Sequence, residues 1–128
     1  MGGKKTATLV KKSFENDGEV ITPEKTYAAT VNFGLVAATK IVAQPGWKWS
    51  DCIKPVFVGD SCQAGHVGMI LQGTIHVVSD DGSEITATAG DAYSFAPGHD
   101  VWIVGDEEFI AYEFNNSGKD YAVWQTDD

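Results

Sequence analysis

Turn-forming residues interrupt this chain at short, nearly even intervals, and that spacing limits its fold more than any other feature. Between positions 73 and 105 a glycine recurs every seven to nine residues, at 73, 82, 90, 98 and 105. Runs of β-branched and aromatic residues, the types enriched in strands, fill residues 75–78, 101–104 and 109–114. No stretch of ten or more residues combines helical periodicity with helix caps. The pattern therefore predicts an all-β protein whose short antiparallel strands form a sandwich or a barrel.

The clearest single element is a β-hairpin around Asp81-Gly82. Apolar and polar residues alternate on both sides of this dipeptide, as Ile75 and Val77 do with the residues between them. Asp-Gly tolerates the positive φ angles of a tight type I′ turn, which we therefore predict here. His76 falls on the polar face of the hairpin and is predicted to be an exposed strand histidine.

The length of 128 residues and the 43% hydrophobic content suit one globular domain. We expect an N-terminal extension or edge strand over residues 1–25, a barrel over 26–121 and a short C-terminal tail over 122–128. Thr26 to Val31 has the composition of a strand. No apolar run is long enough to span a membrane, and no secretory leader opens the chain. Cys52 and Cys62 are too few for a disulfide framework and are expected to stay reduced in a cytoplasm.

The charge of the chain excludes two classes of partner. Its 18 acidic residues outnumber nine basic ones, which are all lysines, and the net charge is −9. Proteins that bind nucleic acids or anionic membranes gather lysine and arginine to meet phosphates. We therefore expect neither nucleic acid nor a membrane as a partner.

Residues 46 to 114 resemble the cupin superfamily of small double-stranded β-helix barrels. Cupins carry a first motif G-x5-H-x-H with a Glu six residues before a Gly, and a second motif G-x5-P-x-G-x2-H. The glycines of both motifs fall in place here, at 46, 73, 90 and 98. The resemblance implies an all-β fold, a jelly-roll-like barrel of antiparallel strands. It also implies a homodimer, since such barrels frequently pack face to face.

The metal-binding positions of the two motifs match less well. Cys52 and Lys54 stand where the first motif has its two histidines, and His66 stands where it has the Glu. In the second motif Val101 replaces the histidine, and His99 lies two residues earlier. Cys52 and His66 can bind a divalent transition metal such as zinc or iron, with His99 or water completing the shell. The resemblance thus implies the barrel fold but does not establish that a cofactor is bound.

These positions nevertheless predict a site in the barrel mouth. Cys52 and Lys54 share a face if they lie in a strand, and His66 joins them from the neighbouring motif. His66 and Lys54 are the candidate catalytic residues, and Cys52, Trp49 and His99 join them as candidate ligand contacts. Simpler interpretations stay open, namely a buried hydrophobe for Cys52, a solvated rim residue for Lys54, a hydrogen-bonded His66 and a turn residue at His99.

Aromatic residues around the two motifs have their own predicted roles. Trp47 and Trp49 are predicted either to wall the pocket mouth or to pack against the barrel end. Tyr93, Phe95 and Trp102 are predicted to be core or dimer-interface residues rather than site residues.

Two functions follow as hypotheses. The first is a small-molecule-binding barrel whose Cys/Lys/His site acts on or holds a small compound that can carry a carboxylate. The alternative is a metal-dependent cupin enzyme of the isomerase, dioxygenase, lyase or decarboxylase type. A fold alone does not decide between catalysis and binding.

Overall fold

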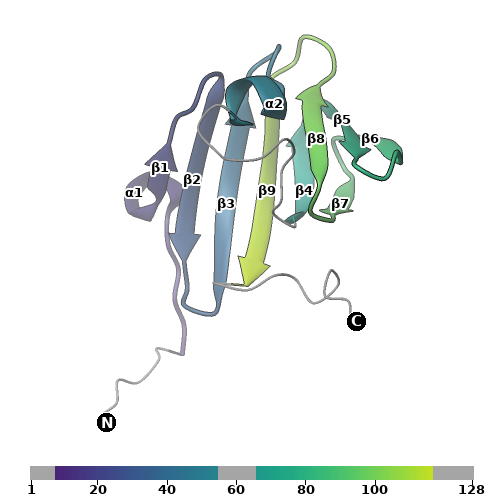
Figure 1. Ribbon diagram of the computed structural model, residues 1–128. Coiled ribbons are helices and arrows are strands. Elements are labelled where there is room, and N and C mark those ends of the chain that lie inside the picture. The colour runs from purple at the N-terminus through teal and green to yellow at the C-terminus, as the bar shows by residue number, and fades with distance from the viewer. Residues whose placement is uncertain (1–7, 55–65, 117–128) are drawn as a thin grey trace, which may run out of the picture.

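The computed structural model describes residues 8–54 and 66–116, which form a barrel of short strands with two single-turn helices (Figure 1). Its elements in chain order are α1 (Phe14–Asp17), β1 (Glu19–Ile21), β2 (Thr26–Asn32), β3 (Val36–Ala43), α2 (Trp49–Cys52), β4 (His66–Gln72), β5 (Thr74–Ser79), β6 (Glu84–Thr88), β7 (Ala92–Phe95), β8 (His99–Ile103) and β9 (Phe109–Asn116).

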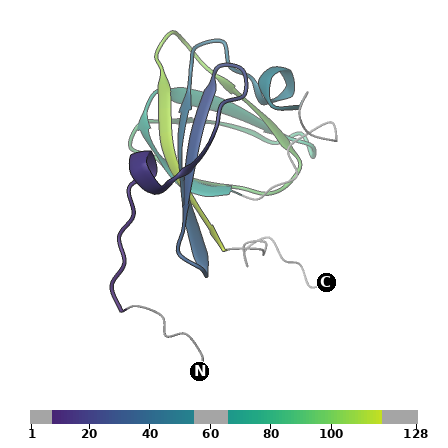
Figure 2. The same ribbon diagram turned by 90° about the vertical axis from the view of Figure 1, so that its left-hand side faces the viewer.

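The strands form two sheets that face each other (Figure 2). The larger sheet has six strands in the order β1-β2-β3-β9-β4-β7, and the smaller has three in the order β6-β5-β8. Every pairing between neighbouring strands is antiparallel. The predicted all-β class with antiparallel strands is therefore confirmed. The predicted strand from residue 26 is present as β2, and β1 is an edge strand within the predicted extension, whereas the predicted tail over 122–128 lies outside the described residues.

The core lies between the two sheets because alternate side chains of each strand point inward. Ile70 and Ala111 face it from the large sheet, and Ile75, Val77 and Ile103 face it from the small one. Ile70 and Ile75 are 1% and 2% exposed, and burying a side chain of this size stabilises a fold by about 1.5–3 kcal/mol. The hydrophobic effect therefore closes the barrel around a narrow apolar layer, and polar groups on the same inward faces are exceptions that require partners.

The predicted hairpin is present as β5 and β6, but its turn is not type I′. A type I′ turn needs positive φ at both central residues, and Gly82 alone of the Asp81-Gly82 pair has it, at +94°. The strands instead close through a longer loop, in which Ser79 N donates to Ser83 O. Asp81 accepts hydrogen bonds from the amide and the hydroxyl of Ser83 at 2.9 and 2.6 Å, which fixes the loop without a second positive φ.

His76 lies on the outer face of β5, as its polar neighbours predicted, but it is half-buried by its partners. Its ring nitrogens lie 2.7 Å from Thr86 Oγ1 and 2.6 Å from Glu84 Oε1. The ring of Trp102 lies 5.0 Å away, centroid to centroid. These contacts are on the outer face, so His76 belongs to the surface of the small sheet and not to the barrel interior.

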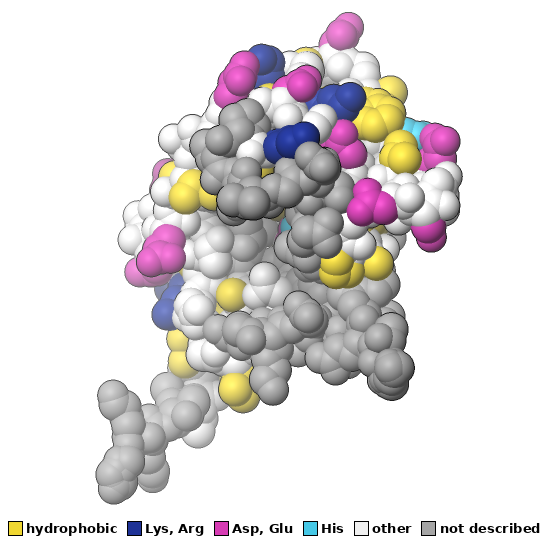
Figure 3. Space-filling view, in the orientation of Figure 1, with side chains coloured by type: hydrophobic (Ala, Val, Ile, Leu, Met, Phe, Trp, Pro, Cys, Tyr) yellow, Lys and Arg dark blue, Asp and Glu magenta, His cyan; other side chains and the backbone are white. Residues whose placement is uncertain are grey.

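Neither helix in the described ranges is long and apolar enough to cross a membrane. In Figure 3 lysine and carboxylate side chains lie close to one another on the described part of the face in view.

The outer face of β4 and β9 is apolar, and we expect it to form the predicted dimer interface. Met69, Leu71 and Phe114 lie on this face, and each is about half exposed. Contiguous exposed apolar side chains of this kind mark interaction surfaces. At tens of micromolar we expect a mass of about 27 kDa by light scattering, twice that of one chain. Met69→Lys should lower this mass toward that of the monomer, while the matched change Val104→Lys outside this face should not. A monomeric wild type would refute the dimer.

Candidate functional site

A row of inward-facing residues crosses the middle of the large sheet. Glu113 of β9 is directly opposite Gly68 of β4, and Gly68 is in turn directly opposite Tyr93 of β7. Because all three occupy inward positions, the side chains of Glu113 and Tyr93 approach each other across the glycine. His66 lies two residues before Gly68, on the same face of β4.

Gly68 makes room for this approach. A Cβ atom at this position would lie 2.8 Å from the hydroxyl oxygen of Tyr93 and 2.9 Å from Cγ of Glu113. It would also lie 2.5 Å from the backbone oxygen of Tyr112. Both distances to the side chains are too short for any Cβ, so the absence of a side chain at Gly68 is what allows the two polar groups to meet.

The carboxylate of Glu113 accepts hydrogen bonds from two side chains. Tyr93 donates its hydroxyl proton to Oε2 over 2.5 Å, and Nδ1 of His66 lies 2.7 Å from Oε1. The Glu113 and His66 side chains are only 15% and 25% exposed. Burial on its own would raise the pKa of Glu113, but the charge of His66, the hydrogen bonds from His66 and Tyr93, and the charge that His99 carries when protonated outweigh it. The pKa of Glu113 therefore lies below its ordinary value, and the carboxylate is ionised at neutral pH.

His99 adds a second imidazole to this group from the opposite sheet. It begins β8, is 3% exposed, and its ring centroid lies 5.2 Å from that of His66 and 5.5 Å from that of Phe95. Its Nδ1 lies 2.7 Å from the carbonyl oxygen of Ala96, which can only accept, so Nδ1 carries the proton. In the neutral ring Nε2 is then a hydrogen-bond acceptor. This nitrogen has no partner among the residues that the structure describes.

An ionised carboxylate, a phenol and two imidazoles thus meet inside an otherwise apolar barrel. We call His66, Tyr93, His99 and Glu113 the interior polar cluster. Groups of these types can accept, hold and return protons, and a carboxylate that accepts from an imidazole fixes the orientation of that ring. The cluster therefore has the composition of an acid–base or ligand-binding site.

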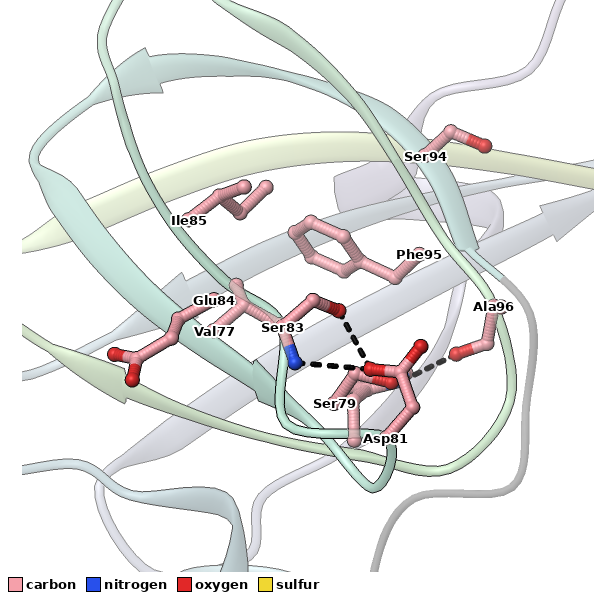
Figure 4. A pocket seen from close by; sticks show the side chains of 10 residues that line it. Val77, Ser79, Asp81, Ser83, Glu84, Ile85, Ser94, Phe95 and Ala96 are labelled. Atoms are coloured by element: carbon pink, nitrogen blue, oxygen red, sulfur yellow. Dashed lines mark hydrogen bonds between the residues drawn. The ribbon is translucent and has the colours of Figure 1, made fainter.

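A cavity of about 250 Å³ opens beside the cluster, between the β5–β6 hairpin and the segment that joins β7 to β8 (Figure 4). Phe95 lies in the middle of this view, between Ile85 and the Ser83 turn. The lining residues are Val77, Ser79, Asp81, Ser83, Glu84, Ile85, Ser94, Phe95, Ala96 and His99. His99 is the member of the cluster that lines this cavity, so a small molecule in the cavity can contact the cluster through His99.

The structure brings two of the five predicted site residues together. His66 and His99 come from different sheets, and their rings are in contact. The interpretation of His99 as a turn residue is wrong, since it is a buried strand residue. Asp100 is not its partner either, because that carboxylate accepts from the amides of Ser50 and Val101.

The prediction that Cys52 and Lys54 share an inward strand face is wrong. Trp49–Cys52 is the helix α2, in which Cys52 N donates to Lys48 O and Ile53 N to Trp49 O. Lys54 lies beyond the end of this helix, and neither residue is in a strand, so the alternation of side chains along a strand does not apply to them.

Cys52 lies toward the other end of the barrel from the cluster. It is buried and lies close enough to Lys25 to interact with it electrostatically, although the raised pKa of Lys25 is due mainly to Glu24. Lys25 directly precedes β2. The first residue of β2 is in register with Ala43 of β3, and Ala43 is in register with Phe109 of β9, so Lys25 lies at the Phe109 end of β9. Glu113 is four residues further along β9, about 13 Å at the rise of a strand. The roles predicted for Cys52 and Lys54 as catalytic, ligand or metal residues stay predictions.

Both tryptophans near α2 are packed against other parts of the barrel. Trp49 is 8% exposed within α2. Trp47 packs against the core, and its Nε1 donates to Thr26 Oγ1 over 2.8 Å. These contacts favour the packing alternative for Trp47, whereas a ligand contact by Trp49 stays a prediction.

The described residues do not by themselves fit the metal that the resemblance implies. Within residues 8–54 and 66–116, no three His, Cys, Asp or Glu side chains are arranged to hold an ion. Both oxygens of Glu113 already accept from His66 and Tyr93, and Nδ1 of His99 is used by a backbone carbonyl. Zinc or iron at Cys52 and His66 therefore stays a prediction.

Sequence reasoning missed two members of the cluster. Tyr93 and Phe95 were predicted to be core residues, and both are buried in the core with their rings stacked at 4.3 Å, but Tyr93 also binds Glu113. Glu113 was not singled out. Two features of the sequence could have identified Glu113. It is the only charged residue in β9, and the residues two and four positions earlier, Ala111 and Phe109, face the core.

Comparison with known proteins identifies the fold. No protein-family model matches the chain, and no curated protein matches it. Solved structures do match. The oxalate decarboxylase of Lactobacillus farciminis in its formate complex is 14% identical, with a TM-score of 0.63 over 91% of this chain and 35% of that one. A mutant of the Bacillus subtilis oxalate decarboxylase is 16% identical, with a TM-score of 0.62 over 94% of this chain and 33% of that one.

These neighbours are cupin-fold proteins, so the chain has the cupin barrel fold. The likeness is structural and the sequence identity is low. The chain also spans only about a third of the length of these neighbours. The comparison therefore confirms the predicted fold and carries no activity over to this protein.

Proposed function

We propose that this barrel binds a small molecule in its interior, next to the polar cluster of His66, Tyr93, His99 and Glu113. The observation that carries the proposal is the ionised carboxylate of Glu113 inside the barrel, hydrogen-bonded to His66 and Tyr93, while His99 of the same cluster lines an open cavity. A well-packed apolar core is usually at least as stable as one containing a buried ion pair. A cluster that does not improve stability is better explained by a ligand that uses it.

Each member of the cluster has a distinct role in this proposal. His99 lines the cavity and offers an acceptor nitrogen to the bound molecule. Glu113 orients the His66 ring and favours a proton on it, and Tyr93 holds the carboxylate from the other side. A bound molecule that exchanges a proton with this cluster would do so within a site shielded from bulk water, where proton transfer is efficient. The cluster thus supports binding first and acid–base catalysis as an extension of it.

A metal-dependent enzyme is the second candidate. Its support is that the structural neighbours are described as oxalate decarboxylases, and that a carboxylate bonded to an imidazole commonly orients a metal-binding histidine. The discriminating measurement is elemental analysis of protein purified without added metal. Zinc or iron at one equivalent per chain would favour the enzyme, and its absence would favour the metal-free site proposed first.

The binding proposal is tested by exchanging the cavity histidine. A small-molecule library is screened by thermal shift, and the hits are titrated calorimetrically into wild type and His99→Phe. Losing one hydrogen bond of about 0.5–1.5 kcal/mol should weaken binding roughly two- to tenfold. The control Ser13→Ala removes one hydrogen bond at α1, away from the cavity, and should leave affinity unchanged. Hits that bind both variants like wild type would place binding outside the barrel interior.

A further inference from the structure

The cavity beside His99 joins an apolar wall to an acidic rim. Val77, Ile85 and Phe95 supply the apolar wall, while Asp81 and Glu84 supply carboxylates. Three serines, at positions 79, 83 and 94, add hydroxyl groups that can accept or donate. In Figure 4 the Asp81 carboxylate lies beside Ser83 at the hairpin turn, below Phe95, and the Glu84 side chain points away from them toward the left of the view.

The Asp81 carboxylate at the rim is ionised at neutral pH. The hydroxyl and the amide of Ser83 hold the pKa of Asp81 below its ordinary value, and Asp81 is exposed. Glu84 is 57% exposed at its side chain and accepts from His76 on the outer face. The rim therefore presents negative charge to anything that enters.

No cation balances this charge in the lining. None of the ten lining residues is a lysine, and every lysine in the described part of the chain lies at position 54 or earlier. An entering anion would meet the carboxylates of Asp81 and Glu84, whereas a cation would be attracted to them.

The hydrogen-bonding groups at the base of the cavity favour a donor. Nε2 of His99 is an acceptor in the neutral ring, because Nδ1 donates to Ala96. His99 is only 3% exposed. At such a buried position, an acceptor that is left without a hydrogen-bond donor costs free energy. An ammonium group, which has three N–H donors and no acceptor, satisfies both the histidine and the carboxylates.

We propose that the molecule bound in this barrel is a small cationic amine with a compact apolar body, admitted through the cavity of Asp81, Glu84, Phe95 and His99. This inference rests on the proposed function and adds the ligand's charge to it. The volume of about 250 Å³ is at the small end of the roughly 300–1,000 Å³ of ordinary ligand pockets, so it suits a molecule of one ring or a short chain. The apolar wall packs the body, and the rim orients the ammonium group.

Three probes that differ only in charge test the proposal: benzylamine, benzyl alcohol and benzoate. Each is titrated into the full chain at pH 7 and low salt, and backbone amide shifts of residues 77–99 report the site and the dissociation constant. We expect benzylamine to bind at least threefold more tightly than benzyl alcohol and at least tenfold more tightly than benzoate. This preference should shrink at 0.5 M salt, because exposed charges are screened.

Two variants connect the preference to the rim. Glu84→Gln and Asp81→Asn should each reduce the ratio of benzylamine to benzyl alcohol affinity by about two- to fivefold, the effect of one exposed charge pair. Glu15→Gln removes the same charge from α1, away from the cavity, and should leave the ratio unchanged.

The outcomes separate the two proposals. Benzoate binding as tightly as benzylamine, with shifts at the same residues, would overturn the charge preference and leave the proposed binding site in place. An unchanged ratio in both rim variants would overturn it in the same way. Shifts that avoid residues 93–99 for all three probes would overturn both proposals.

Discussion

Replacing Glu113 by Gln should lower the free energy of unfolding at pH 7 by about 2–3 kcal/mol. Breaking a buried pair costs about 3–5 kcal/mol because the remaining partner is left without its counter-charge. The expected loss is smaller than this range here, since the His66 side chain is one-quarter exposed and solvent screens its charge. Urea or guanidinium denaturation measures the change. Glu84→Gln is the matched control, because Glu84 also accepts from a histidine, at 2.6 Å, but at the surface. It should cost less than about 1 kcal/mol.

The same substitution should remove part of the acid sensitivity of the fold. The pKa of Glu113 is lowered in the folded state, so its contribution is fully present above the ordinary carboxyl pKa of about 4.3 and is lost as pH falls through the lower folded value. The stability difference between wild type and Glu113→Gln should therefore be constant near neutrality and shrink in acid. A difference that grows as pH falls would contradict an ionised, partnered Glu113.

Adding one methyl group at Gly68 should lower the free energy of unfolding about as much as removing the charge of Glu113. In Gly68→Ala the new Cβ would overlap the backbone oxygen of Tyr112 as well as the Tyr93 hydroxyl and Glu113 Cγ. β9 is paired on both sides, by β3 and β4, so its backbone cannot move aside cheaply. Overpacking of this kind costs about 3 kcal/mol, or roughly 10–15 °C in melting temperature for a domain of this size.

A substitution at a second glycine, Gly34, distinguishes the effect of crowding from the effect of backbone strain. Gly34 has a positive φ of +99° and open space around it, so Gly34→Ala suffers strain alone. It should cost about 1 kcal/mol. Equal melting temperatures for the two variants would mean that Gly68 is not needed for the close approach of Tyr93 and Glu113.

The sequence predicted the fold well because its signals were local. Turn glycines and alternating residues such as those around Asp81-Gly82 specify strands and hairpins over a few positions. The turn type was missed because the Asp81 carboxylate, through Ser83, stabilises a longer loop that a dipeptide rule does not include. The cupin resemblance rested on glycine spacing, and glycines mark backbone geometry, so it carried the fold correctly.

The site was harder to predict because its members come from strands far apart in the chain. Glu113 meets His66 only because β9 pairs with β4, and it meets Tyr93 across Gly68 only because β4 also pairs with β7. Neither pairing has a local signal. Counting from Gly46 placed Cys52 in a strand, whereas the backbone forms a helical turn there. Spacing rules carried over from a family fail where the intervening segment changes its secondary structure.

The three histidines of the chain allow one direct test of a ligand in the barrel interior. His99 and His66 lie inside and His76 lies on the outer face. Ring ¹⁵N–¹H correlation spectra are recorded while the tightest hit of the library screen is added. We expect the nitrogen signals of His99 to move in a saturable way, those of His66 to follow, and those of His76 to stay in place. Movement of His76 with a stationary His99 would contradict binding beside the interior polar cluster.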